Sequence, residues 1–376
     1  DGLLALCGSG LCISVLGGIG RFVGRHRTEG LRRREALVVV AACWLCAVLL
    51  GGLPYLWTGS MSPIDAIFET SSGFTTTGAT ILVDIEGGLS RPLHLWRVAT
   101  QWMGGMGIVV LFVAIFPLLG VGGKHMFRSE VPGVPSKALQ PRIQETAAVL
   151  WRVYLGLTVA CVISLALMGL PLFDAFAHAF STISTAGFSP RSESIGSYDS
   201  VPVEVCVTLF MLLSGVNFNL FYLGRNSGLM AAIKNVELRV YLGLWATCTS
   251  LIALDLTGSL GSPVEALRAA SFQVASILTT TGFTSADYEQ WSHFSQAILV
   301  LLFFCGGSSG STSGGMKVIR LIIMSRMVVN EIRRSYNPNL VLTVRVGERA
   351  IPSQELTTCT VFALIFMASV ALLGLA

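Results

Sequence analysis

The chain has 376 residues, of which 53% are hydrophobic and only 12% charged, with a net charge of +4 and a mean hydropathy of +0.70. Soluble proteins carry about 25% charged residues, so this composition excludes a soluble globular domain and predicts an all-α polytopic membrane protein. The nine cysteines lie mostly inside apolar runs, which excludes an extracellular disulfide framework.

Apolar segments that approach or exceed the roughly 20 residues needed to span a bilayer recur along the chain. We expect spans over 3–20, 36–53, 94–119, 146–169, 203–223, 240–256 and 294–325, and the start of a further span over 356–376. Three segments between them are too short to cross and are expected to be re-entrant helices: 62–74, 171–185 and 263–278. The chain begins with Asp1 and its last apolar run stops at Ala376, so we expect a fragment at both ends.

Each expected re-entrant helix runs into a short turn of hydroxyl residues and glycine. The three turns are Thr75–Ala79, Ser184–Phe188 and Thr279–Phe283. In a membrane, free backbone carbonyls are tolerated only where they line protein or water, and a glycine-centred turn can point carbonyls at one axis to bind a dehydrated cation. One such turn alone is explained by helix capping. Three copies predict a cation filter, and the lack of acids in the turns favours a monovalent ion.

Basic residues are unevenly distributed between the two sides of the membrane. Of the 25 Lys and Arg residues, 21 lie in or beside four loops, at 21–34, 124–142, 225–239 and 317–349. The four others are Arg91, Arg97, Arg191 and Arg268. The positive-inside rule then places the four basic loops in the cytoplasm and the three turns on the outer side, which predicts a multi-pass protein of the cytoplasmic (inner) membrane.

Three acids fall in the first two re-entrant helices. Asp65 and Asp174 each lie 13 residues before the glycine of their turn, where an acid caps free N–H groups and complements the helix dipole. Ala269 stands at the third equivalent position, so the third copy is expected to lack this acid. Glu69 is expected to be buried and to hydrogen-bond behind the first turn, although an intramembrane acid is also a functional candidate.

A glycine- and serine-rich segment from Cys305 to Lys317 interrupts the expected span 294–325. Its glycines oppose a regular lipid-facing helix, so we predict a broken helix whose loop crosses below the turns and gates them. A flexible linker does not fit the apolar flanks. A phosphate loop fails because Met316 separates Gly315 from Lys317. A helix-packing stretch of small residues remains the alternative.

Other polar candidates are weaker. The small residues in 101–107 favour close helix packing over ion contact. Asn217 and Asn219 either line the pore or hydrogen-bond a broken turn around Gly215. The five histidines have no ligand spacing, so no metal cofactor site is predicted, and no residue grouping supports an enzyme.

Five motifs together resemble the Trk/Ktr/HKT superfamily of potassium transporters, over essentially the whole chain. They are Asp65–Glu69 leading to Thr75–Ala79, Gln101–Ile108, Gly120–Gly123, Pro141–Thr146, and Gly306–Arg320. The resemblance implies a potassium-channel-like, pseudo-fourfold pore of four helix–pore-loop–helix units with a gating loop in the third. It also implies a homodimer and a cytosolic nucleotide-binding (TrkA-like) regulatory subunit.

The resemblance also implies site residues. The K⁺ filter would comprise Thr76, Thr77, Gly78, Ala79, Thr185, Ala186, Gly187, Phe188, Thr280, Thr281, Gly282 and Phe283. The gating loop would comprise Gly306, Gly307, Ser308, Ser309, Gly310, Ser311, Thr312, Ser313, Gly314, Gly315 and Lys317. In this superfamily a glycine at the position of Gly78 goes with K⁺ and a serine with Na⁺. The chain departs from the pattern in its fourth unit, which stops in its first helix, without a fourth filter or the return helix that carries an arginine near the gate.

The predicted organisation has five parts: a partial N-terminal helix and basic loop (1–35), pore repeat 1 (36–123), a cytoplasmic loop with repeat 2 (124–235), repeat 3 with its gating loop and a cytoplasmic loop (236–350), and an incomplete repeat 4 (351–376). The predicted function is potassium uptake through a backbone-carbonyl filter gated by an intramembrane loop. The alternatives are an Na⁺ or mixed-cation transporter on the same fold and a secondary transporter of small organic solutes. No cofactor besides the transported K⁺ and no nucleic-acid partner are expected.

Overall fold

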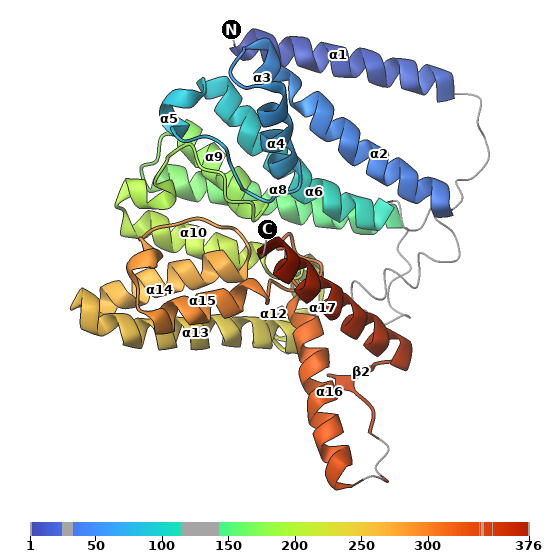
Figure 1. Ribbon diagram of the computed structural model, residues 1–376, viewed down its shortest axis with the longest axis vertical. Coiled ribbons are helices and arrows are strands. Elements are labelled where there is room, and N and C mark those ends of the chain that lie inside the picture. The colour runs from blue at the N-terminus through green and yellow to red at the C-terminus, as the bar shows by residue number, and fades with distance from the viewer. Residues whose placement is uncertain are drawn as a thin grey trace.

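The computed structural model describes residues 2–24, 33–114, 143–337, 339, 342–347 and 349–374, and this part of the chain is almost entirely helical (Figure 1). The predicted basic segments within 25–32 and 115–142, including the motif Gly120–Gly123, lie outside the described residues. The strands described are β1 (Arg345–Val346) and β2 (Arg349–Ala350), which pair antiparallel.

Within the described residues, five helical segments are long and apolar enough to cross a membrane. They comprise α1 (Gly2–Val23), α2 (Arg33–Gly51) continued by α3 (Leu53–Trp57), α8 (Ile143–Leu167), α13 (Val236–Leu260) and α17 (Ser353–Gly374). They coincide with five predicted spans. Helix α6 (Arg91–Ala114) occupies the predicted span 94–119 as far as the structure describes it.

Three short helices lie among these spans at the predicted re-entrant segments: α4 (Pro63–Phe74), α9 (Leu172–Ile183) and α14 (Pro263–Leu278). Many buried positions on α9 and α14 are alanines or serines. Small residues let helix backbones approach closely where lipid gives no hydrophobic drive for association. The small residues of α9 and α14 therefore allow close packing against the neighbouring helices.

The helix starts correct two predictions about the acids. Ser62 accepts a hydrogen bond from the Asp65 amide, and Ser262 accepts one from the Glu265 amide in the same Ser-Pro-x-acid pattern. The third copy therefore does have its acid, one helical turn further from the glycine because α14 has 16 residues and α4 has 12. Helix α9 starts after Pro171 without a side-chain cap, and Asp174 instead bonds Arg191 and Tyr198.

Two predicted spans are interrupted. The predicted span 203–223 consists of α10 (Val201–Ser214) and α11 (Phe218–Ser227), bent by 89°. The span 294–325 is broken as predicted, into α15 (His293–Phe303) and α16 (Val318–Tyr336). Figure 1 shows α16 extending away from the other helices, beside α17. The remaining short helices are α5 (Ile85–Gly88), η3 (Ser194–Tyr198), α12 (Leu229–Ile233) and η4 (Tyr288–Gln290).

Candidate functional site

Helices α4, α9 and α14 end in turns with the same backbone conformation. A threonine in the left-handed region comes first, with φ of 55°, 53° and 58° at Thr76, Thr185 and Thr280. A glycine follows two residues later, with φ of 79°, 86° and 83° at Gly78, Gly187 and Gly282. A left-handed conformation costs a non-glycine residue about 1–2 kcal/mol. Three threonines held in it at equivalent places indicate that the turn geometry is required.

The turn amides fold back onto their own helices with one repeated pattern. In the first turn the amides of residues 75, 76 and 77 donate to the carbonyls of residues 71, 73 and 72, and the same offsets recur at 184–186 and 279–281. Among the described residues, the carbonyls of 76–79 and 280–282 accept no hydrogen bond from the protein. The first and third turns thus keep backbone oxygens available for a ligand, as a cation site requires.

The turns lie beside one another in chain order, with the same step from the first to the second and from the second to the third. A Cβ placed on Gly78 would come closer than 3.0 Å to the carbonyl oxygen of Ala186. A Cβ on Gly187 would come equally close to the carbonyl oxygen of Thr281. Around Gly282 nothing lies within 4 Å of that position among the described residues. The two glycines are therefore required for the close approach of neighbouring turns.

Helix α6 holds the second turn through Gln101, which is fully buried. Its Nε2 donates to the carbonyl of Ala186 at 2.9 Å, and its Oε1 accepts from the Ser181 hydroxyl at 2.9 Å and from the Phe188 amide at 3.2 Å. Further along, Gly104 allows α6 to approach the Phe74 carbonyl at the end of α4. The packing predicted for 101–107 is therefore present, and the sequence missed that its first residue also anchors a turn.

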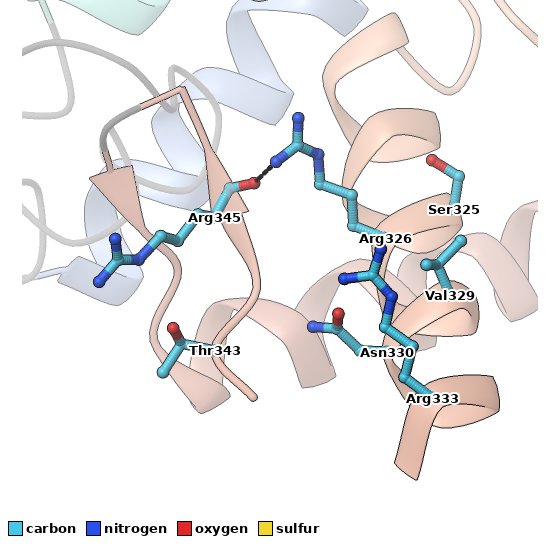
Figure 2. A pocket seen from close by; sticks show the side chains of 7 residues that line it. All are labelled: Ser325, Arg326, Val329, Asn330, Arg333, Thr343 and Arg345. Atoms are coloured by element: carbon cyan, nitrogen blue, oxygen red, sulfur yellow. Dashed lines mark hydrogen bonds between the residues drawn. The ribbon is translucent and has the colours of Figure 1, made fainter. Parts of the chain in front are cut away.

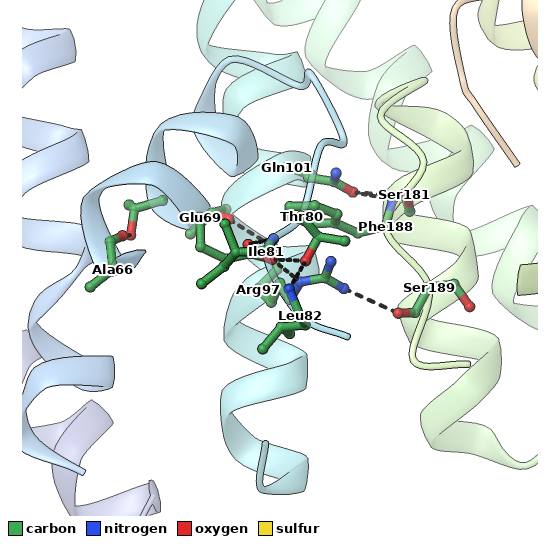
Figure 3. Close-up of polar contacts among 12 residues, drawn as sticks. Ala66, Glu69, Thr80, Ile81, Leu82, Arg97, Gln101, Ser181, Phe188 and Ser189 are labelled. Atoms are coloured by element: carbon green, nitrogen blue, oxygen red, sulfur yellow. Dashed lines mark hydrogen bonds and ion pairs between the residues drawn. The ribbon is translucent and has the colours of Figure 1, made fainter. Parts of the chain in front are cut away.

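A buried ion pair connects the segments that follow the first two turns (Figure 3). Arg97 Nε lies 2.5 Å from Glu69 Oε1, both side chains are at most 1% exposed, and Arg97 Nη1 donates to the Ser189 carbonyl at 3.1 Å. The guanidinium stacks 3.6 Å from the ring centre of Phe188.

On the other side, Glu69 accepts from the Thr80 hydroxyl at 2.9 Å and from the Ile81 amide at 3.2 Å. Glu69 therefore lies behind the first turn, as predicted. Arg97, which the sequence assigned only to the outer side of the membrane, is its ion-pair partner. The available signal was that an intramembrane acid needs a partner.

The segment from Phe304 to Lys317 is not helical, so the alternative of a continuous packing helix is wrong. It contacts the C-terminal end of α9 and the turn that follows α14. The Thr312 hydroxyl donates to the carbonyl of Ile183, the last residue of α9, at 3.0 Å, and the Gly314 amide donates to the Thr280 hydroxyl at 2.6 Å. Its five hydroxyl residues, Ser308, Ser309, Ser311, Thr312 and Ser313, are buried.

The same loop fills the break between α10 and α11. The Ser308 amide donates to the Gly215 carbonyl at 2.9 Å, and the Phe218 amide donates to the Gly310 carbonyl at 3.1 Å. Asn217 caps α11 by accepting from the Asn219 amide at 3.0 Å. Of the two roles considered for Asn217, the structure thus gives it the bonding of the broken turn.

Ionic and aromatic contacts lie beside the second turn, where the chain continues into the loop that contains η3. Arg191 bridges Glu86 at 3.3 Å and Asp174 at 3.2 Å, and Tyr198 donates to Asp174 at 2.8 Å. Burial raises the pKa of the Tyr198 hydroxyl, which stays protonated as a donor. His178 lies 3.1 Å from that hydroxyl.

A separate surface hollow of about 310 Å³ lies between α16 and the strand segment (Figure 2). Arg326 donates to the carbonyl of Arg345, whose own guanidinium points away from Arg326. The hollow is lined by Ser325, Arg326, Val329, Asn330, Arg333, Thr343 and Arg345. No cluster of three or more potential metal-binding His, Cys, Asp or Glu residues occurs in the described part of the chain.

Comparisons with known proteins agree over almost the whole length. Residues 7–376 match the family model "TrkH: Cation transport protein". The chain is 38% identical to the Trk system potassium uptake protein TrkH of Salmonella typhimurium, over 94% of this chain and 75% of the relative. It is 41% identical to TrkH of Halomonas elongata, over 87% of this chain and 69% of the relative. The crystal structure of the potassium transporter TrkH from Vibrio parahaemolyticus superposes with a TM-score of 0.85 and 35% identity, covering 97% of this chain and 77% of that one.

Proposed function

The chain belongs to the TrkH family of cation transport proteins, and we propose that it mediates potassium uptake across the cell membrane through its three threonine–glycine turns. The observation that carries this proposal is the equal backbone geometry of the three turns, together with the free carbonyls of residues 76–79 and 280–282. Neutral backbone oxygens replace the hydration shell of a weakly hydrated monovalent cation. An inside-negative membrane potential drives entry with about 2.3 kcal/mol per 100 mV.

In this proposal the turns are parts of one pseudo-fourfold selectivity filter built from helix–pore-loop–helix repeats. The equal step from Gly78 to Ala186 and from Gly187 to Thr281 supports a rotational arrangement, and the open side of Gly282 leaves room for a further turn. The proposed filter residues are Thr76–Ala79, Thr185–Phe188 and Thr280–Phe283. The free carbonyls favour ion coordination over recognition of an organic solute, and Glu69 is neutralised by Arg97.

The loop Gly306–Lys317 is proposed as the gate below this filter. Its contacts with the end of α9 and with Thr280 support a position on the path of an ion that leaves the turns. Its buried hydroxyls and backbone obstruct that path in the present conformation. Ion passage then requires the loop to shift.

The positive-inside rule supports an orientation with the turns outside and the end of α16 in the cytoplasm. The arginine-lined hollow at α16 then faces the cytoplasm. The domain division proposed is the one expected from the sequence, with repeats over 36–123, 124–235 and 236–350. The relatives are named as parts of a Trk system, which supports further components, proposed as a second copy of the chain and a cytosolic nucleotide-binding subunit.

The test is uptake of radioactive rubidium by the full-length protein in cells that lack their own potassium importers. Uptake well above the empty vector, reduced by excess K⁺ more than by excess Na⁺, is the expected result. Vector-level uptake despite normal amounts in the membrane would contradict the proposal. Equal competition by Na⁺ and K⁺ would instead support the mixed-cation alternative.

A further inference from the structure

The first turn of α13 binds the middle of the loop Gly306–Lys317. Glu237 accepts from the Ser309 amide through Oε1 at 2.6 Å and from the Ser309 hydroxyl through Oε2 at 2.9 Å. Both residues are buried, with 4% and 1% of their surface exposed. Hydrogen bonds to a charged carboxylate are stronger than neutral ones. One buried side chain therefore fixes both the backbone and the side chain of a single loop residue.

We infer that Glu237 is a latch that holds the gating loop in its obstructing position, so that loop movement requires the two bonds to Ser309 to break. This inference rests on the proposed function, because it presupposes that the loop gates ion flow. Glu237 does not touch the free carbonyls of the turns. It is a positioning residue that acts through the loop.

The helix end that carries Glu237 is held in place by hydrogen bonds. Asn235 caps α13 by accepting from the Leu238 amide at 3.0 Å, and one turn further Tyr241 donates to the Leu212 carbonyl of α10 at 3.1 Å. Glu237 thus lies at the start of a helix that is hydrogen-bonded to α10. The loop itself contains no regular secondary structure between Phe304 and Lys317. Because the helix is held and the loop is not part of a helix, the loop is the element that moves when the bonds break.

The rest of the loop is held by different kinds of contact. Ser308 and Gly310 bond the α10–α11 break through backbone groups, and Thr312 donates a hydroxyl to a backbone carbonyl. At the far end, the Lys317 ammonium donates to the Ser313 carbonyl within the loop segment. Glu237 instead reaches Ser309 from another helix with a carboxylate side chain. A side-chain substitution can therefore remove the latch without altering the loop sequence.

The experiment measures rubidium uptake by full-length variants in importer-deficient cells, normalised to protein in the membrane. Glu237→Ala removes both bonds, and Glu237→Gln keeps an acceptor for the Ser309 amide. Ser309→Ala removes only the hydroxyl bond. A fourth variant deletes residues 308–313, alone and together with Glu237→Ala. Glu204→Ala is the control, because Glu204 is also a buried acid in the first turn of a helix but pairs with Arg268 away from the loop.

We expect Glu237→Ala to raise uptake about tenfold without any regulatory subunit, with Glu237→Gln and Ser309→Ala in between and Glu204→Ala not raised. In the loop-deletion background Glu237→Ala should not change rubidium uptake further. If Glu237 only stabilised the fold, the substitution would alter uptake in that background as well. Unchanged or lower uptake in Glu237→Ala, or full additivity with the deletion, would overturn the latch. If Glu237→Ala does not reach the membrane, Glu237→Gln and Ser309→Ala carry the same test. A wild type without uptake contradicts the proposed function instead.

Discussion

Replacing Gly78 is the most direct test of how the turns fit together. Gly78 has φ of 79°, and a Cβ there would come closer than 3.0 Å to the carbonyl oxygen of Ala186. Alanine therefore adds two effects, a strained backbone and a displaced carbonyl on the neighbouring turn. Gly261 separates them, because its φ is 69° but nothing lies within 4 Å of the same position. Gly261→Ala adds the strain alone.

The two effects have different sizes. A left-handed alanine costs about 1–2 kcal/mol at either position. Overpacking against a fixed neighbour costs about 1–3 kcal/mol more at Gly78. The group that the alanine displaces is the Ala186 carbonyl, which belongs to the proposed filter. If that second cost appears in ion binding, it weakens binding about 5- to 150-fold. Gly78→Ala is thus expected to reduce rubidium uptake at least about fivefold relative to Gly261→Ala.

The assay compares rubidium uptake at several rubidium concentrations for wild type, Gly78→Ala, Gly78→Ser and Gly261→Ala, each normalised to protein in the membrane. Gly78→Ser is also measured with Na⁺ as competitor. When the Ala186 carbonyl is displaced, the proposed filter no longer fits the larger Rb⁺ and K⁺ ions. Na⁺ is therefore expected to compete more strongly in this variant than in wild type.

Two results would refute the reasoning about Gly78. One is equal uptake by Gly78→Ala and Gly261→Ala, since the contact with the Ala186 carbonyl would then have no functional effect. The other is an unchanged ion preference in Gly78→Ser, which would remove Gly78 from the proposed filter.

Three further variants test the surroundings of the turns. Arg97→Met leaves a buried carboxylate without its partner and should lower the unfolding free energy of the purified protein by about 3–5 kcal/mol. Arg349→Ala is the control: it breaks a partly exposed pair and should lower the unfolding free energy by only about 0–1 kcal/mol. Equal losses in the two variants would contradict a buried pair at Arg97. Gln101→Leu keeps the volume but leaves buried backbone groups unpaired at about 1–3 kcal/mol each, and should reduce rubidium uptake. Gln296→Leu is its control, because the side chain of half-buried Gln296 bonds only the Glu289 carbonyl among the described residues, and wild-type uptake in both variants would dismiss the anchoring role. Deleting residues 308–313 should raise basal uptake, whereas a loss or no change would count against the loop as a gate.

The turns could be predicted from the sequence because their information is local. Each copy places a threonine and a glycine at fixed positions after a short apolar helix, and the structure repeats one backbone conformation at all three. The broken span before Lys317 was predictable for the same reason, since its glycines and serines are contiguous. The acid Glu265 at the start of α14 was missed because distance was counted from the glycine, although the local pattern Ser262-Pro263-x-Glu265 repeats Ser62-Pro63-x-Asp65.

The contacts that hold the turns depend on distant partners and could not be read from spacing. Arg97 and Glu69 are 28 residues apart, and their pairing depends on which faces of α4 and α6 meet. Gln101 precedes a run of small residues that helix packing already accounts for. Its bonds to Ser181, Ala186 and Phe188 therefore left no separate signal in the sequence. The break after Ser214 was weakly marked, because its backbone groups are satisfied by a loop about 90 residues later.

That last dependence has a consequence for biosynthesis. The Gly215 carbonyl and the Phe218 amide bond Ser308 and Gly310, which emerge from the ribosome much later. An unsatisfied backbone group in lipid costs several kcal/mol. The half-made protein therefore cannot release the bent α10–α11 segment into lipid in its final shape. The segment either waits in the aqueous interior of the insertion machinery or enters as a straight helix that unwinds when the later loop arrives.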